Sequence, residues 1–445
     1  MTMLARRGAN IPIASMLAAA LLILCGDAAL AADRTGQEDW AAAIHGGRGG
    51  RILRVTTLAH DGPGSLRAAI ASEGPRIVVF EVGGVIDLRR QNIVIDQPDL
   101  TIAGQTAPSP GITLIRGGVL VQAHQVIVQH LRIRPGEAGM RKHSGWEVDA
   151  IATQGPAHDV LIEHCSMSWA TDENASASGP RFLGGDLAAW RRNTSHRVRF
   201  QSNLIAEGLA DSTHGKGEHS KGSLVHDNAR DIQFIGNLFA HNGERNPMFK
   251  GGASGAIINN LIYDPGARAI HYNLSAWEWE GMPHQEGELL VVGNVLRAGP
   301  STGDLAFLMI GGGGDLALHE EDNLAVDRIG RPLPQRGSYS TAALQVRERA
   351  LPMPPGVHAR PSAEVQEWVL REAGARPWDR DATDIRIIAD TVEGRGRIIS
   401  SEEDVGGYPQ QAPSARAFDP ALWQLDTMRP SATGRDTRCM GLECG

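Results

Sequence analysis

From about residue 76 to residue 325 the chain repeats a short unit of alternating apolar and polar residues, closed by an asparagine or a small residue. Val, Ile and Phe fill the apolar positions, and such period-two alternation is typical of β-strands with one buried face. Helical periodicity is nearly absent here. The pattern predicts many short strands, with examples at residues 158–165, 196–203, 231–237, 256–260 and 290–294.

The residues that close these units are regularly spaced. Cys165, Asn203, Asn237, Asn260 and Asn294 are separated by 38, 34, 23 and 34 residues. A repeat in this range indicates stacked supersecondary units, and short strands with a bend after each suit a β-solenoid with coils about 4.8 Å apart. We expect the asparagines to form a hydrogen-bonded ladder inside the bend. If 23 residues is the bare coil, the longer spacings carry loops on one side of the solenoid.

Both ends of a solenoid need a cover, because an open end exposes unpaired strand edges. The segment Ser65–Ile70 predicts a capped helix just before a first strand at Ile77–Val82. Beyond the repeat the sequence is rich in Pro, Arg and Glu, with one predicted helix at Ala363–Ala373. We predict a β-helix domain over residues 32–335 and an irregular tail over 336–445 that packs on it. A small separate module is the alternative for the tail.

Residues 1–31 are a predicted signal peptide. Arg6 and Arg7 precede an apolar stretch, and Ala29-Leu30-Ala31 offers a small-x-small cleavage site. The apolar stretch is too short for a membrane span, and no later one approaches the roughly 20 residues that a span needs. We therefore predict a secreted protein, extracellular or periplasmic, without a membrane segment in its mature part.

Cysteine usage is compatible with export. Cys439 and Cys444 could form a small terminal disulfide in an oxidising compartment. Cys165 stands in an apolar run, and we expect it to be a small buried residue.

Charge excludes one class of partner. The net charge of −8 at pH 7 disfavours nonspecific nucleic-acid binding. Of 43 basic residues only four are lysines, and all four lie between residues 142 and 250. In a chain whose default cation is arginine, these lysines indicate positions that favour a compact ammonium group.

Acidic and basic residues occupy consecutive repeats in this same region. Stacking would bring residues 20 to 35 positions apart into one groove, with carboxylates first and cations next. Oxygen ligands hold Ca²⁺, and a metal with cations can neutralise a substrate carboxylate and acidify the adjacent C–H. A solvated surface of mixed charge is the alternative. The residues concerned are Asp149, Asp172, Glu173, Lys216, Lys221, Arg245 and Lys250.

Several motifs in order resemble the pectate lyases of polysaccharide lyase family 1, over most of the mature chain. Gly64–Ile70 resembles the family's opening, and Asp149–Ile151 followed by Val160–Ser166 resembles its metal-site and strand signature. Arg245–Lys250 resembles the R-x-P-x-x-R motif, and Asn259–Tyr263 the NN-aromatic turn. The resemblance implies an all-β, right-handed, single-stranded parallel β-helix that cleaves pectate by calcium-assisted β-elimination, giving 4,5-unsaturated oligouronides.

The resemblance also implies metal ligands. Asp149, Asp172 and Glu173 would bind Ca²⁺. Asp172 and Glu173 are adjacent here, whereas the family often spaces its second and third acidic ligands about one helical turn apart. The number and affinity of the calcium ions therefore stay open.

By the same resemblance, Arg245 would abstract the proton from C5 of the uronate, and Lys221 or Lys216 would bind the substrate carboxylate. The second arginine of the motif is Lys250 here, which keeps the charge but loses the bidentate fork. Arginine is normally protonated, but a cation ~5 Å away at an effective dielectric of ~20 disfavours its charged form by about 3 kcal/mol. We therefore expect an alkaline optimum; hydroxide delivered by Arg245 is the alternative.

Other functions are compatible with parts of this pattern. A β-helix polygalacturonase needs two carboxylates that flank the bond, but Asp172 and Glu173, as neighbours on a strand, would point to opposite faces. A lyase for another uronate or for pectin, and a non-catalytic carbohydrate-binding solenoid, are further alternatives. We expect a monomer.

Histidines and aromatic residues near the cations are each compatible with a functional role and with a structural one. His214 and His219 flank Lys216 and give a weak zinc signal beside an ordinary structural role. Tyr272 and the tryptophans Trp277 and Trp279 lie in a long insertion, where they could stack on sugar rings or pack the loop onto the solenoid.

Overall fold

The computed structural model describes residues 39–340 and 345–431, and the described residues from Ala41 onward form one compact unit. The predicted signal peptide and the pair Cys439 and Cys444 lie outside the described residues. Among those described, no helix has the length and apolar character to cross a bilayer.

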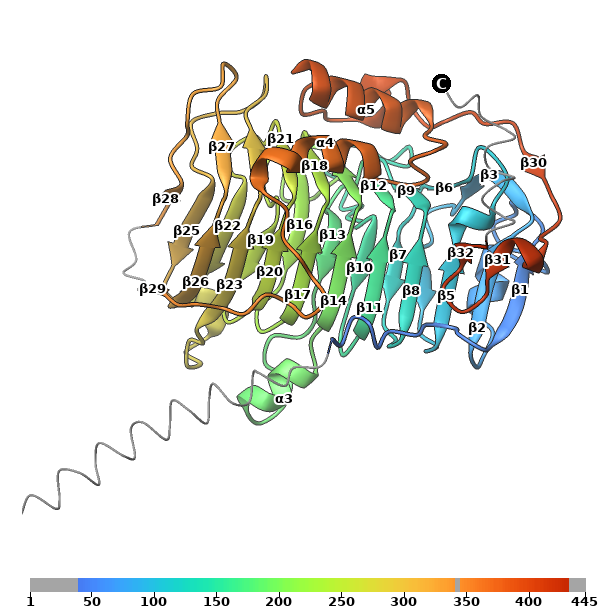
Figure 1. The fold of residues 1–445 in the computed structure, drawn as a ribbon, viewed down its shortest axis with the longest axis horizontal. Coiled ribbons are helices and arrows are strands. Elements are labelled where there is room, and N and C mark those ends of the chain that lie inside the picture. Colours follow the sequence, from blue (N-terminus) through green and yellow to red (C-terminus); the bar gives the residue numbers. More distant parts are fainter. Residues whose placement is uncertain (1–38, 341–344, 432–445) are drawn as a thin grey trace, which may run out of the picture. The chain divides into compact units, whose positions relative to one another are not determined.

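The chain winds through three sheets in turn, and each strand pairs in parallel with its counterpart one coil later (Figure 1). This is a parallel β-helix, as predicted. The first sheet contains β1 (Arg51–Val55), β2 (Arg76–Phe80), β5 (Leu100–Ala103), β8 (Val126–Gln129), β11 (His158–Glu163), β14 (His196–Gln201), β17 (Arg230–Ile235), β20 (Ser254–Ile258), β23 (Gly287–Val292), β26 (Leu316–Glu321) and β29 (Val346–Glu348).

The other two sheets alternate with the first along the chain. The second contains β4 (Ile93–Ile95), β7 (Val119–Val121), β10 (Ile151–Thr153), β13 (Glu173–Ala177), β16 (Lys221–Val225), β19 (Met248–Lys250), β22 (Ile270–Leu274), β25 (Leu308–Gly312) and β28 (Arg336–Ser338). The third contains β3 (Val82–Asp87), β6 (Ile112–Ile115), β9 (Leu131–Arg134), β12 (Ser166–Ser168), β15 (Leu204–Ala206), β18 (Leu238–Ala240), β21 (Leu261–Tyr263), β24 (Val295–Arg297), β27 (Leu324–Val326) and the antiparallel β30 (Ser414–Ala415).

The predicted asparagine ladder is present at the bend between the first and third sheets. The backbone N–H of Cys165 donates to the side-chain oxygen of Asn203 at 2.8 Å, and Asn203 donates in the same way to Asn237 at 2.9 Å. The ladder continues to Asn260 and Asn294. Each side chain thus satisfies a buried backbone donor in the preceding coil, which a bend without strand pairing would leave unpaired.

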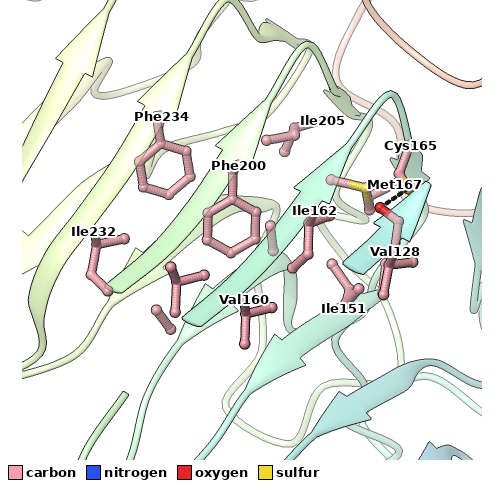
Figure 2. Packing of buried hydrophobic residues seen from close by; sticks show 14 of the residues in the cluster. Val128, Ile151, Val160, Ile162, Cys165, Met167, Phe200, Ile205, Ile232 and Phe234 are labelled. Atoms are coloured by element: carbon pink, nitrogen blue, oxygen red, sulfur yellow. Dashed lines mark hydrogen bonds between the residues drawn. The ribbon is translucent and has the colours of Figure 1, made fainter. Parts of the chain in front are cut away.

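The core lies between the three sheets and is built from like residues stacked coil on coil. Figure 2 shows part of it. Phe200 and Phe234 lie in register on β14 and β17, with ring centroids 4.9 Å apart and planes inclined by 6°. Ile162 on β11 stacks in register below Phe200. Cys165 is a free thiol with no exposed surface, as expected for a small buried residue.

The N-terminal end is covered by the predicted helix, α2 (Leu66–Ile70), whose N-cap Ser65 accepts a hydrogen bond from the Ala68 N–H. Leu66 and Ile70 are buried in the main core. The expected first strand, Ile77–Val82, is in fact preceded by β1, which pairs with β2 and lies before the helix. The apolar residues of β1 do not alternate with polar ones, and only Val55 is buried, so the alternation pattern did not reveal this strand.

Two helices of the tail lie along the third sheet: α4 (Ser362–Glu372), close to its predicted bounds, and α5 (Ala382–Glu393), which the sequence analysis missed (Figure 1). Val365 and Ile387 pack with strands of that sheet. A short hairpin, β31 (Trp423–Gln424) with β32 (Arg429–Pro430), follows near the N-terminal coils, where Met428 packs with Ile77. The boundary at residue 335 stays a prediction, since β28 and β29 lie beyond it.

Buried ion pairs also connect the tail to the coils. Arg134 on β9, with no exposed side-chain surface, donates to Asp381 at 2.6 and 3.0 Å and to Asp384 at 2.8 Å. Arg132 lies 3.4 Å from Asp384. These carboxylates belong to the N-terminus of α5, so this helix supplies the counter-charges that the buried arginines require.

The long insertions border both edges of the second sheet rather than one side. Residues 178–195, which include α3 (Leu187–Arg192), and residues 275–286, which begin with a 3-10 turn (Ala276–Trp279), follow strands β13 and β22. Residues 135–150 and 207–220 precede strands β10 and β16. The outer face of the second sheet therefore lies between two sets of loops.

Candidate active site

The outer face of the second sheet carries a groove. Its floor is one outward row of side chains, in register from strand to strand and mostly apolar or small. A hollow of about 330 Å³ lies over the part between β7 and β16 and reaches the acidic residues at the strand ends. The row consists of Val94, Leu120, Ala152, Ser176, Leu224, Met248, His271 and Met309.

Three predicted metal ligands meet at one edge of this groove. Asp149, Asp172 and Glu173 each offer a carboxylate oxygen, and these oxygens lie within 4.8 Å of one another. Asp149 accepts hydrogen bonds from the Glu173 N–H at 3.0 Å and from the Ser176 hydroxyl at 2.5 Å. The loop before β10 and the start of β13 are thereby held together.

The electrostatics of this cluster fit a bound cation. Burial and the neighbouring Asp172 raise the pKa of Asp149 to about 8. For Asp172, burial is outweighed by the hydrogen bond and charge of His219 and by His214, so its pKa lies below the ordinary value. Carboxylates this close repel one another unless a proton or a cation lies between them. Three hard oxygen donors match the preference of Ca²⁺, so the residues fit this ion.

His214 and His219 lie behind the acidic cluster. Their rings stack with centroids 3.8 Å apart, and the Nε2 atoms lie 3.6 and 2.8 Å from the same oxygen of Asp172. The Lys216 N–H donates to Nδ1 of His214 at 3.1 Å, which requires the proton of that neutral ring on Nε2. A protonated Nε2 has no lone pair for a metal, so this tautomer disfavours metal ligation by His214 through the atom nearest Asp172.

Cations from the next coils lie beside the carboxylates. Arg245 forms an ion pair with Glu173, and Lys221, in register with Glu173, forms one with Glu244. Glu244 also pairs with Arg268. Burial acts to raise the pKa of Glu244, but the charges of neighbours that include Lys221 and Arg268 outweigh it and lower this pKa to about 2.

The environment of Arg245 changes its acidity. Burial lowers the pKa of Arg245, while the charges of Asp172 and Asp149 oppose this shift. Its backbone has φ 63°, a left-handed turn conformation that costs a non-glycine residue some energy and that residues at other bends of this chain also adopt. The guanidinium is therefore held in the groove by the turn that leads into β19.

Lys250 lies at the opposite end of β19, on the other edge of the groove. It forms an ion pair with Glu278 and lies 3.4 Å from Asp227. Arg181 contacts the same two carboxylates, at 2.9 Å from Asp227 and 3.2 Å from Glu278. The two insertions that follow β13 and β22 thus converge on Lys250.

Comparisons with known proteins agree with this geometry. No family model matches the chain. "Probable pectate lyase C" from Aspergillus flavus is 31% identical over 379 residues, which cover 84% of this chain and 80% of that protein. The protein of the same name from Emericella nidulans is 30% identical over 405 residues, covering 89% and 84%. The chain belongs to the pectate lyase family.

Solved structures show the same fold. Jun a 1, the major allergen from cedar pollen, matches with a TM-score of 0.52 and 14% identity, over 76% of this chain and 92% of the allergen. A Bacillus subtilis pectate lyase variant matches with a TM-score of 0.50 and 13% identity, over 76% and 96%. At these identities the likeness concerns the fold alone, and it agrees with the resemblance drawn from the motifs.

In this member of the pectate lyase family, the two lysines considered for binding the substrate carboxylate lie in different surroundings. Lys221 lies buried in the groove beside Glu173. Lys216 is exposed on the loop between His214 and His219.

The sequence analysis missed the acidic partners of the cations. Glu244 directly precedes Arg245, and that adjacency to a motif residue was the one signal available. Glu278 and Asp227 gave no such signal, because their meeting with Lys250 depends on how two insertions fold.

Proposed function

We propose that this chain cleaves pectate, an unesterified polygalacturonate, by calcium-assisted β-elimination. The observation that carries the proposal is the contact of Glu173, one of three clustered carboxylates, with Arg245 and its register with Lys221. A metal site, a candidate base and a cation for the substrate carboxylate thereby share one groove.

Asp149, Asp172 and Glu173 would hold the calcium ion. When bound, calcium would neutralise the uronate carboxylate and make the neighbouring C5–H more acidic. Lys221 would bind the same carboxylate from the adjacent strand. Its pairing with Glu244 keeps the ammonium in the groove until substrate replaces that partner.

Arg245 would take the proton from C5. The electron pair of the C5–H bond then forms the C4=C5 double bond, the C4–O bond breaks, and the leaving oxygen takes up a proton from water. Since Glu173 is shared between the metal cluster and Arg245, loss of that ion pair would remove a charge that stabilises protonated Arg245. Lys250 would orient the substrate from the far edge of the groove.

A polygalacturonase is the main competing enzyme. A hydrolase needs one carboxylate on either side of the scissile bond, whereas the three carboxylates here lie together on one edge with cations beside them. The opposite-edge acids, Asp227 and Glu278, are paired with Lys250 and Arg181. This distribution favours a lyase.

The deciding experiment is product analysis on a panel of uronans. Pectate, methylated pectin and a uronan of different sugar composition are incubated with the purified protein, and unsaturated product is followed by its ultraviolet absorbance. We expect absorbance to rise with pectate. Shortened polymer without unsaturated ends would instead indicate hydrolysis, and binding without shortening a non-catalytic solenoid. Export through the predicted signal peptide and a monomeric state are part of the same proposal.

A further inference from the structure

The groove changes character beyond the coil that carries Arg245. Tyr339 directly follows β28, which pairs with β25 through Met309 and Gly337. Its ring lies over Gly311 of β25: a Cβ placed on that glycine would stand 2.8 Å from Cζ of the tyrosine ring. The Tyr339 hydroxyl donates to the carbonyl oxygen of Tyr272 in β22 at 3.3 Å. The side chain therefore leans back across one whole strand towards the catalytic coil.

Contacts with charged and aromatic groups fix this position. The guanidinium carbon of Arg268 lies 4.9 Å from the centroid of the Tyr339 ring, which is cation–π geometry. The His271 ring centroid lies 6.1 Å from it. Arg268 pairs in turn with Glu244, the partner of Lys221. Tyr339 is thus connected through ion pairs to the residues proposed to bind substrate.

Burial along the groove floor shows what the ring covers. His271 belongs to the outward row of the second sheet, yet it is 2% exposed, and neither ring nitrogen has a hydrogen-bond partner. Leu224, two strands earlier in the same row, is half-buried, and Val94 at the far end is 41% exposed. Ala152 and Ser176 are also buried, but they are small residues that line the 330 Å³ hollow, and Met309 on β25 is half-buried again. The cover over His271 is therefore local to the place where the Tyr339 ring lies.

This cover lies close to the reacting position. Arg245 leads into β19, the strand next to β22, and neighbouring strands are about 4.8 Å apart. A sugar residue of an extended polymer spans about one such spacing, so the space between Arg245 and the tyrosine ring holds about one or two sugars. In the other direction the groove continues over five strands, including the 330 Å³ hollow.

We propose that Tyr339 is a specificity-determining residue that ends the substrate groove beside the catalytic coil, so that the enzyme releases short oligouronides from a chain end of the polymer. This inference rests on the proposed lyase function. The fragment that lies towards Tyr339 is short in every cycle, whichever direction the polymer takes.

The test compares the number of bonds broken with the loss of viscosity of polygalacturonate, and sizes the products by mass spectrometry from the first few per cent of reaction. For the wild-type protein we expect short oligomers from the start and a slow fall in viscosity per bond broken. Tyr339→Gly should yield longer oligomers early and a several-fold faster fall in viscosity per bond. Tyr339→Phe, which keeps the ring, should keep the wild-type product profile.

A second variant approaches the same question without removing the tyrosine. Gly311→Ala should push the ring away and change the profile in the same direction as Tyr339→Gly. A broad ladder of products from the wild-type protein, or an unchanged profile in both variants, overturns the inference while leaving the lyase intact. Absence of unsaturated product from every uronan contradicts the proposed function and this inference together.

Discussion

Arg245 donates a hydrogen bond through its guanidinium to Glu173, which lies 72 residues earlier in the chain. The proposed base and a proposed metal ligand are therefore partners in the same ion pair. A cation bound by the Glu173 carboxylate would change the electrostatic environment of Arg245, so the proposed metal binding and proton abstraction would be coupled through one side chain.

Calcium dependence is the first prediction. A chelator should abolish activity on pectate and added Ca²⁺ should restore it, because the three clustered carboxylates would hold the ion on which the proposed reaction depends. Asp149→Ala removes the ligand that touches both Glu173 and Ser176 and should raise the calcium concentration for half-maximal rate about tenfold or more. Glu321→Gln, on an exposed end of β26, is the matched control and should leave the requirement unchanged. Full activity in excess chelator would reject the metal assignment.

Arg245 should matter more for turnover than for binding. General-base catalysis contributes about 10²–10⁴-fold, so Arg245→Lys should lower kcat by about 100-fold or more while KM changes little. Arg347→Lys, on an exposed arginine of β29, is the control. If Arg245→Lys retains more than about a tenth of the wild-type kcat, another group is the base.

Lys250→Ala provides the contrasting measurement. Lys250 contacts Glu278 and Asp227 at the far edge of the groove, away from the Glu173–Arg245 pair. Its loss should mainly raise KM, with kcat less affected. The two carboxylates lose a counter-charge in this variant, which acts to destabilise the fold. A thermal melt of the variant therefore separates a change in substrate binding from a loss of stability.

Trp277 is the aromatic residue of the insertion that is free to meet a sugar ring. Its exposed fraction is 81%, whereas Tyr272 and Trp279 have none. Trp279 is fixed by a 2.9 Å hydrogen bond from its indole N–H to Asp227. Trp277→Ala should raise KM for long pectate several-fold and leave kcat nearly unchanged, since stacking contributes about 1 kcal/mol. Equal KM values for both proteins would show that Trp277 does not contact the polymer.

Acid stability should depend on Asp381. Burial acts to raise the pKa of this carboxyl, but Arg134 outweighs it and holds the pKa well below its ordinary value. A group with a depressed folded-state pKa stabilises the protein above its unfolded-state pKa, about 3.9, and loses that contribution as the pH falls further. The Tm should therefore drop below about pH 4.

The variant Asp381→Asn tests this assignment. It leaves a fully buried Arg134 with one counter-charge fewer, so unfolding at neutral pH should become easier by on the order of 3 kcal/mol. Its melting temperature should also fall less steeply between pH 5 and pH 3 than that of the wild-type protein. Asp426→Asn, on the exposed loop before β32, should behave like the wild type.

The C-terminal tail should be required for stability. Truncation after residue 336 removes α4 and α5 and exposes the apolar face of the third sheet that Val365 and Ile387 cover. It also leaves Arg132 and Arg134 without Asp381 and Asp384. We expect a lower Tm or loss of solubility. A truncated protein that melts like the full chain would show that the tail is an independent appendage.

Local patterns in the chain were enough to predict the coils. Alternating apolar residues and a recurring asparagine fixed the strands and the ladder from Cys165 to Asn294, because each of these features depends on residues close in sequence and on the coil length. Spacing likewise brought Asp149, Asp172 and Glu173 together in the prediction. A coil that repeats stacks equivalent positions, whatever the loops between them do.

Tertiary structure decided the partners of these residues. The position of Lys221 beside Glu173 follows from strand register across 48 residues, with a long insertion between them whose path no local pattern gives. Glu278 meets Lys250 only because two insertions fold against each other. Tyr339 reaches β22 because Gly311 leaves space for its ring. Loop paths and side-chain direction depend on packing across coils, and no periodic pattern in the sequence encodes that packing.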